Sequence, residues 1–176
     1  MDPVLLWTAA IVLSGLFLTA GWHKLVLPGY YRDLIAGHVR MPAAFTEFVR
    51  IVLLITEIST GLLLLLPATR PLAAWSALGL LLLYSLLITV GLIRGLDLDC
   101  GCSGPRAGLK LSPWLLLRNM GLILVAWMLT LPASNRFTGI EDCLIVIFAS
   151  STLGLIYLSY EHLLANSEKL TLLRHR

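Results

Sequence analysis

Five long stretches of this sequence are almost free of charged residues. They cover residues 3–22, 51–69, 71–93, 119–135 and 143–160, and Glu57 is the one charged side chain within them. A helix needs roughly 20 apolar residues to cross about 30 Å of hydrocarbon. Backbone groups in lipid must form their hydrogen bonds internally, which a helix achieves along its whole length. The pattern therefore predicts five transmembrane helices.

The composition agrees with a protein that lies in a membrane. Hydrophobic residues make up 58% of the chain and charged residues 13%, whereas a soluble domain has about 45–50% and about 25%. The net charge of +3 is spread along the chain, so no basic domain for nucleic acid is expected. The first apolar stretch lacks a basic leader and an A-x-A site, which indicates a retained helix rather than a signal peptide.

We expect an all-α, polytopic membrane protein with one transmembrane domain, residues 1–163. The predicted spans are 4–24, 50–66, 71–94, 113–133 and 142–162. Between the first two spans, aromatic and charged residues alternate in a mixture that suits the headgroup layer, with a turn at Pro28-Gly29. Ser112 and Pro113 are typical of an N-cap and a first helical residue. Residues 164–176 are expected to form an amphipathic tail on the surface.

The basic residues predict an orientation. With five spans, the connections after the first and third spans and the C-terminal tail share one side of the membrane. That side holds eleven of the thirteen basic residues: Lys24, Arg32, Arg40, Arg50, Arg94, Arg106, Lys110, Arg118, Lys169, Arg174 and Arg176. The positive-inside rule places this side in the cytoplasm.

The same alternation gathers candidate functional residues in one half of the membrane. Lys24 ends the first span, Arg118 and Asn119 lie in the second turn of the fourth, and the third connection holds a Cys-Gly-Cys sequence. Glu57 lies seven residues into the second span, about 10 Å deep. Six residues can therefore converge on one site: Lys24, Glu57, Cys100, Cys102, Arg118 and Asn119.

Glu57 requires a partner or a proton, since burying its charge in lipid costs a few kcal/mol or more. We expect Arg118 to be its first candidate partner and Lys24 its second. A pair of this kind can serve function, or it can be a structural ion pair that fixes two helices.

Cys100 and Cys102 allow three interpretations. A disulfide across a two-residue separation is geometrically restricted and easily reduced, which suits thiol–disulfide exchange, and Gly101 supplies the backbone freedom for it. Two thiolates can instead bind a soft metal, completed by His23 or His38. The pair can also be inert. Cys143 begins the fifth span on the opposite face, so we expect it to be a plain buried thiol rather than a resolving cysteine.

At these positions the chain resembles the MauE branch of the DoxX-like membrane proteins. The resemblance covers about residues 15–125. It is carried by Gly21-Trp22-His23-Lys24-Leu25 with Pro28, Met41-Pro42, Glu57 with Gly61, Cys100-Gly101-Cys102-Ser103-Gly104, and Leu117-Arg118-Asn119. The chain departs from the pattern at Ser103, where family members often have an aromatic residue.

The resemblance implies a four-helix antiparallel bundle, with the fifth transmembrane helix and the tail as an addition. It also implies a redox-associated role in a bacterial inner membrane, with a thioredoxin-like partner, in the maturation of a disulfide-rich periplasmic protein. Related DoxX-like proteins are linked to thiosulfate oxidation and to quinones. Periplasmic disulfide chemistry favours an outward-facing cysteine pair, whereas the basic residues predict a cytoplasmic one, and we follow the basic residues.

Three functions compete on this basis. The first is a membrane thiol–disulfide redox protein that exchanges electrons with a thioredoxin-like partner or a quinone. In it Arg118 and Lys24 favour the thiolate, and Glu57 takes or gives the proton. The second is a non-catalytic accessory subunit of a larger membrane complex. The third is a soft-metal carrier.

Overall fold

The computed structural model describes residues 1–38, 42–95, 112–132, 134 and 139–174. Over these residues the protein is all-helical. The helices are α1 (Pro3–Val26), α2 (Pro28–His38), α3 (Ala43–Leu64), α4 (Arg70–Ile93), α5 (Pro113–Met128) and α6 (Ile140–Arg174). Cys100 and Cys102 lie outside the described residues, as do Arg40, Arg106 and Lys110.

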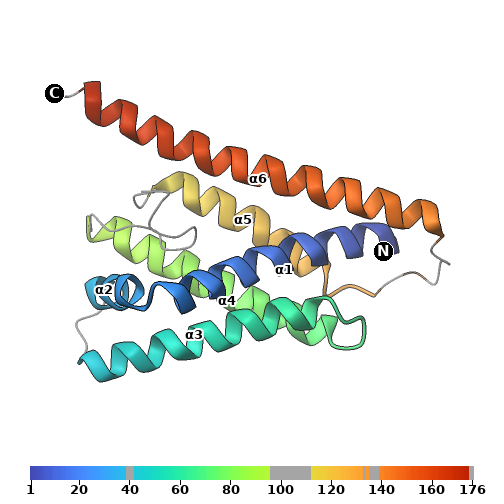
Figure 1. Ribbon diagram of the computed structural model, residues 1–176, viewed down its shortest axis with the longest axis horizontal. Helices are drawn as coiled ribbons and strands as arrows, with labels where there is room; N and C mark the ends of the chain where they lie inside the picture. The colour runs from blue at the N-terminus through green and yellow to red at the C-terminus, as the bar shows by residue number, and fades with distance from the viewer. Residues whose placement is uncertain (39–41, 96–111, 133, 135–138, 175–176) are drawn as a thin grey trace.

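Four helices form an antiparallel bundle, as the resemblance to the MauE branch implies (Figure 1). The helix α1 packs against α3, α3 against α4, and α4 against α5, and α1 also contacts α5. The long α6 lies on the outside of the bundle against α1. At one end of the bundle α1 and α4 finish and α3 and α5 begin; the short α2 also lies there, and we call this the α2 end.

The first residues of the helices follow from local chemistry. The Asp2 carboxylate accepts a hydrogen bond of 2.9 Å from the amide of Val4, and Pro3 opens α1. Proline suits this position because its fixed φ is helical and the first amides have no partner in the helix. Pro113 opens α5 in the same way, and Ser112 has the extended backbone of an N-cap, although its side chain makes no capping hydrogen bond.

The segment between the first two spans differs most from the expectation. Pro28-Gly29 begins the helix α2 rather than a turn, since proline is accommodated in a first helical turn. The helix α3 begins at Ala43, seven residues before the predicted start, so Glu57 is its fifteenth residue. At the other end of the chain, α6 continues to Arg174 without a break near residue 163.

The helices have the lengths and surfaces of a multi-pass membrane protein. Among the described residues, α1, α4 and the Ile140–Tyr160 part of α6 are long and apolar enough to cross a bilayer, and α5 is a shorter apolar helix. Large apolar side chains point outward, such as Leu72, Ile93 and Phe148, which are 71%, 80% and 70% exposed. Together with the lengths of these helices, such an apolar surface indicates contact with the hydrocarbon of a bilayer. The protein is therefore an all-α polytopic membrane protein.

Candidate functional site

A buried ion pair joins α1 to α3 inside the bundle. The ammonium of Lys24 donates a hydrogen bond of 2.8 Å to Oε1 of Glu57. The Lys24 side chain is 5% exposed and the Glu57 side chain is fully buried. Charges at this depth are tolerated only when they are paired, so the two residues depend on each other.

Helix geometry explains why these two side chains meet. Side chains on a helix tilt toward its N-terminus. Lys24 is near the C-terminal end of α1, so its side chain runs back into the bundle instead of out to the headgroups. The helix α3 is antiparallel to α1, so the side chain of Glu57 tilts toward the α2 end and meets the lysine. Close packing of the two helices allows this, because Gly21 lies against Glu57 and Ile58.

Two tyrosines complete the surroundings of the ion pair. The hydroxyl of Tyr84, on α4, donates a short hydrogen bond to the same Oε1 of Glu57. The ammonium of Lys24 lies 4.9 Å from the ring centroid of Tyr31 and 5.5 Å from that of Tyr84. A cation over an aromatic face is stabilised by the ring electrons, most strongly when water is excluded. Tyr31 is itself 2% exposed, so α2 covers the site.

The sequence predicted neither tyrosine as a site residue. Tyr31 resembled a headgroup-layer aromatic, and Tyr84 lies in a stretch without charges. The available signal was the position of Tyr84 within an apolar helix, because a buried tyrosine hydroxyl usually requires a hydrogen-bond partner.

The second carboxylate oxygen of Glu57 distinguishes the site from a fully satisfied ion pair. Oε2 is buried and, within the part of the chain that the structure describes, has no hydrogen-bond partner. A buried carboxylate oxygen without a donor is costly. This oxygen is the atom at which a proton, or a further donor, can be accepted.

A second polar network secures the α2 end of the site. The guanidinium of Arg50 donates a hydrogen bond of 2.7 Å to the carbonyl of Lys24 and also binds the carboxylate of Glu47. Arg32 of α2 binds Glu47 at 3.1 Å. Glu47 lies three residues before residue 50, the predicted start of the second transmembrane span. Hydrogen bonding to Arg50 lowers the pKa of the Glu47 carboxyl to about 2. Arg50 thus ties the last turn of α1 to α3.

The predicted order of partners for Glu57 is reversed. Lys24, and not Arg118, forms the ion pair. Arg118 donates a hydrogen bond of 3.2 Å to the hydroxyl of Tyr157 on α6. Successive helical residues point about 100° apart, and on α5 it is Asn119 that faces the interior. Asn119 is 2% exposed, and its Nδ2 lies 3.3 Å from Oγ of Ser85.

The cysteines fall into two groups. Cys100 and Cys102 belong to the connection between α4 and α5, outside the described residues. The end of α4 and the start of α5, which flank this connection, both lie at the α2 end (Figure 1). Cys143 is a free, exposed thiol in the first turn of α6, at the opposite end, so the expectation that it is buried is wrong.

The soft-metal interpretation gains nothing from the described residues. Within them, no group of three His, Cys, Asp or Glu side chains is arranged to hold a metal ion. Of the two candidate histidines, His23 is described, and its buried Nδ1 has no hydrogen-bond partner among these residues. The side chain of His38 lies outside them.

The arrangement of Lys24, Glu57 and Tyr84 is suited to holding and moving a proton. An ammonium, a carboxylate and a phenol share one buried location, and two of the groups bind one carboxylate oxygen. In a medium of low dielectric, such hydrogen bonds are strong.

Known proteins match the chain over most of its length. The model of a family described as methylamine utilisation protein MauE matches residues 2–132. The methylamine utilization protein MauE of Paracoccus denitrificans is 32% identical over 165 residues, which are 90% of this chain and 87% of the relative. The MauE protein of Methylophilus methylotrophus is 26% identical over 161 residues, 90% and 85% of the two chains. No solved structure matches the chain.

Proposed function

Because the chain belongs to the MauE family, we propose that it is a membrane thiol–disulfide redox protein in which Cys100 and Cys102 form the exchanging pair. The observation that carries the proposal is the buried Lys24–Glu57–Tyr84 group. It lies in the half of the bundle toward the α2 end, where the connection that holds both cysteines also begins and ends.

The chain length supports proximity between the cysteines and the α2 end. Cys100 is five residues after Gly95, so its Cα lies within about 18 Å of that of Gly95. The proposal requires the connection to fold over the bundle, so that the two sulfurs face the buried group.

The reaction is a two-electron exchange. When the two thiols of Cys100 and Cys102 are oxidised, one S–S bond forms and two electrons and two protons leave. The electrons reduce a disulfide of a thioredoxin-like partner, which takes up two protons and becomes a dithiol. A quinone is the second candidate acceptor. In the reverse direction the membrane protein is reduced and the partner is oxidised.

We assign separate roles to the residues around the pair. Glu57 takes or gives a proton at Oε2, the oxygen without a donor among the described residues. Tyr84 and Lys24 position this carboxylate and stabilise its charge. Lys24 and Arg118 favour the thiolate, because nearby cations lower the pKa of a thiol. Asn119 positions α5 against α4 through Ser85.

The setting of this activity follows from the family and from the charges. The relatives are described as methylamine utilization proteins, and we propose that this chain likewise supports the maturation of a disulfide-containing protein. The excess of basic residues supports a cytoplasmic location for the α2 end in a bacterial inner membrane.

Differential alkylation tests the proposal. In a Cys143→Ser background, mass spectrometry of the alkylated protein should show two labelled thiols after dithiothreitol and none after mild oxidation. Glu57→Gln should slow this oxidation severalfold, whereas Glu47→Gln, on the same helix but outside the buried group, should leave the rate unchanged. Two thiols that stay free under every oxidant would falsify the redox role.

An accessory, non-catalytic role is the second candidate, and the enclosure of the ion pair favours it. Glu57 is fully buried and Lys24 is 4% exposed, which also suits a pair that only fixes α1 to α3. On this alternative, a Cys100→Ser/Cys102→Ser variant keeps full function in cells and co-purifies with a larger complex in fixed stoichiometry. Loss of function with unchanged co-purification rejects it.

A further inference from the structure

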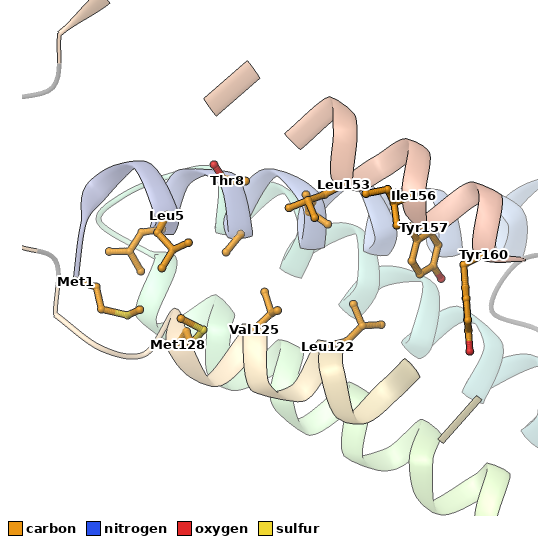
Figure 2. Close-up of a pocket in the computed structure, with 13 residues that line it drawn as sticks. Met1, Leu5, Thr8, Leu122, Val125, Met128, Leu153, Ile156, Tyr157 and Tyr160 are labelled. Carbon is orange, nitrogen blue, oxygen red and sulfur yellow. The ribbon is translucent and has the colours of Figure 1, made fainter. Parts of the chain in front are cut away.

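A groove with a volume of about 380 Å³ lies between α1, α5 and α6 (Figure 2). Its walls are apolar side chains from all three helices, among them Leu5, Leu122, Val125 and Leu153. Thr8, also in the wall, donates its hydroxyl to the carbonyl of Val4. The volume falls within the range of about 300–1,000 Å³ that is usual for ligand pockets.

The groove opens to the membrane and not to water. Its lining side chains Leu5, Leu153 and Ile156 are 48%, 47% and 59% exposed. Each belongs to a helix that is long and apolar enough to span the bilayer. Apolar cavities of this kind stay free of water, so the occupant must be hydrocarbon.

One end of the groove is polar and positively charged. There Tyr157 accepts a hydrogen bond from Arg118, and the hydroxyl of Tyr160 lies 3.5 Å from the carbonyl of Trp114. Trp114 is exposed in the first turn of α5, where a tryptophan of the interfacial belt is expected. A guanidinium at this level matches a phosphate in the headgroup layer.

The length of the groove also suits a lipid chain. Tyr160 is level with Trp114 at the start of α5, and Met1 and Met128 lie at the other end (Figure 2). Met128 is fourteen residues after Trp114, which corresponds to about 21 Å along the helix. This exceeds the hydrocarbon thickness of one leaflet, which is about 15 Å, half of the bilayer core.

We propose that this groove holds one acyl chain of an anionic bilayer phospholipid, with the phosphate beside Arg118. The helix α6 packs on α1 and makes polar contacts with α5 near the start of α5. The acyl chain fills the space between α6 and the following turns of α5. The bound lipid then holds α6 to the four-helix bundle.

Photo-crosslinking tests this proposal on the full chain. The protein is reconstituted in phosphatidylcholine vesicles with a phosphatidylglycerol that carries a diazirine in its acyl chain. The crosslinked peptides should come from the groove-lining residues of α1, α5 and α6, saturating at one lipid per chain. Leu153→Trp should reduce the yield about tenfold by filling the groove. Leu155→Trp, on the same helix but outside the lining, should not.

Several results would overturn the proposal. Equal yields in Leu153→Trp and Leu155→Trp would mean that the lipid is only part of the surrounding bilayer. An equally efficient phosphatidylcholine probe would reject the preference for an anionic lipid, and an isoprenoid recovered from the purified protein in place of a phospholipid would reject the occupant. If Leu153→Trp fails to fold, Ile156→Trp and its control Leu158→Trp give the same comparison.

Discussion

At the scale of single residues, Glu57 is a buried charge that depends on its partners. Its carboxylate is fully buried and receives hydrogen bonds from Lys24 and Tyr84 on two other helices. Replacing a buried ion pair by apolar groups is often nearly neutral, whereas removing one partner is costly because an unpaired charge remains. Single and double substitutions at this pair should therefore behave very differently.

We expect Glu57→Gln to lower the free energy of unfolding by about 3–5 kcal/mol, because it leaves the Lys24 ammonium buried without a counter-charge. The double variant Lys24→Met/Glu57→Gln should recover most of this loss. Reversible unfolding in detergent micelles, followed by tryptophan fluorescence, measures both values in a double-mutant cycle.

Glu47→Gln is the matched control for this cycle. It removes a carboxylate from the same helix, but the Glu47 side chain is 29% exposed, and ion pairs near the surface contribute about 0–1 kcal/mol. If Glu57→Gln costs no more than Glu47→Gln, the pair does not stabilise the fold. The stable double variant also separates the two candidate functions, since it removes proton exchange at Glu57 while the fold remains.

The hydroxyl of Tyr84 has a separate, smaller effect. Tyr84→Phe keeps the ring near Lys24 and removes one donor to the carboxylate, so we expect a loss of about 1.5–3 kcal/mol, the usual value for a hydrogen bond to a charged group. The same unfolding measurement applies. Tyr160→Phe, which loses only a 3.5 Å contact with a carbonyl, should change the unfolding free energy by about 0.5 kcal/mol or less. Equal effects of the two substitutions would contradict the assignment.

The sequence alone could not identify the residue that pairs with Glu57. Depth along a helix follows from counting residues, and it placed Lys24, Glu57 and Arg118 in the same half of the membrane. The direction of a side chain around the helix axis depends on how each helix is rotated against its neighbours. Adjacent residues differ by about 100°, which is why Asn119 faces inward and Arg118 points to Tyr157.

At the scale of elements, α1 and α3 approach each other closely at Gly61. A Cβ added to Gly61 would lie 2.9 Å from Cγ of Leu18 and 3.2 Å from the carbonyl oxygen of Ser14. The same glycine carbonyl accepts a 2.7 Å hydrogen bond from the Ser14 hydroxyl. Small residues at such contacts let membrane helices pack backbone to backbone.

We expect Gly61→Ala to destabilise the protein by about 1–3 kcal/mol, the usual cost of overpacking. The backbone oxygen of Ser14 cannot move aside without separating the helices. Gly79→Ala is the control, because an added Cβ there meets nothing within 4 Å. It should stabilise α4 by about 0.5–1 kcal/mol through helix propensity. Thermal unfolding, monitored by circular dichroism, compares the two variants. A shift of the unfolding temperature in the same direction in both would refute the packing argument.

The elements themselves followed from the sequence only where apolar residues form long stretches. The ends of α1 and α4 lie within two residues of the ends of the predicted spans 4–24 and 71–94. The start of α3 was missed because the charged residues Glu47 and Arg50 were interpreted as the boundary of the apolar segment. In the structure they satisfy each other and the carbonyl of Lys24, and the helix includes both. The helix α2 was missed because Pro28 was interpreted as a turn residue.

At the scale of the whole molecule, alternation of the spans decides which residues can meet. The helices α1 and α4 end, and α3 and α5 begin, at the α2 end, while Cys143 starts α6 at the other (Figure 1). The orientation of the protein in the membrane is a second question. The basic residues favour a cytoplasmic α2 end, whereas the resemblance to a periplasmic maturation system favours a periplasmic one. Labelling Cys143 and the cysteines of the connection between α4 and α5 answers both questions together.

We expect a membrane-impermeant maleimide applied to intact cells to label Cys143 in a Cys100→Ser/Cys102→Ser background. In a Cys143→Ser background, after reduction with a permeant reagent, Cys100 and Cys102 should be labelled only once the membrane is opened. The reason is that basic residues resist translocation, which favours a cytoplasmic location for the end of the bundle that carries most of them. Labelling of all three positions from one side would contradict the alternation itself. If Cys100 and Cys102 alone are labelled from outside, the alternation of the spans holds but the orientation is reversed. The proposed exchange would then take place in the periplasm. Basic residues required by the site itself would in that case explain the excess of positive charge at the α2 end.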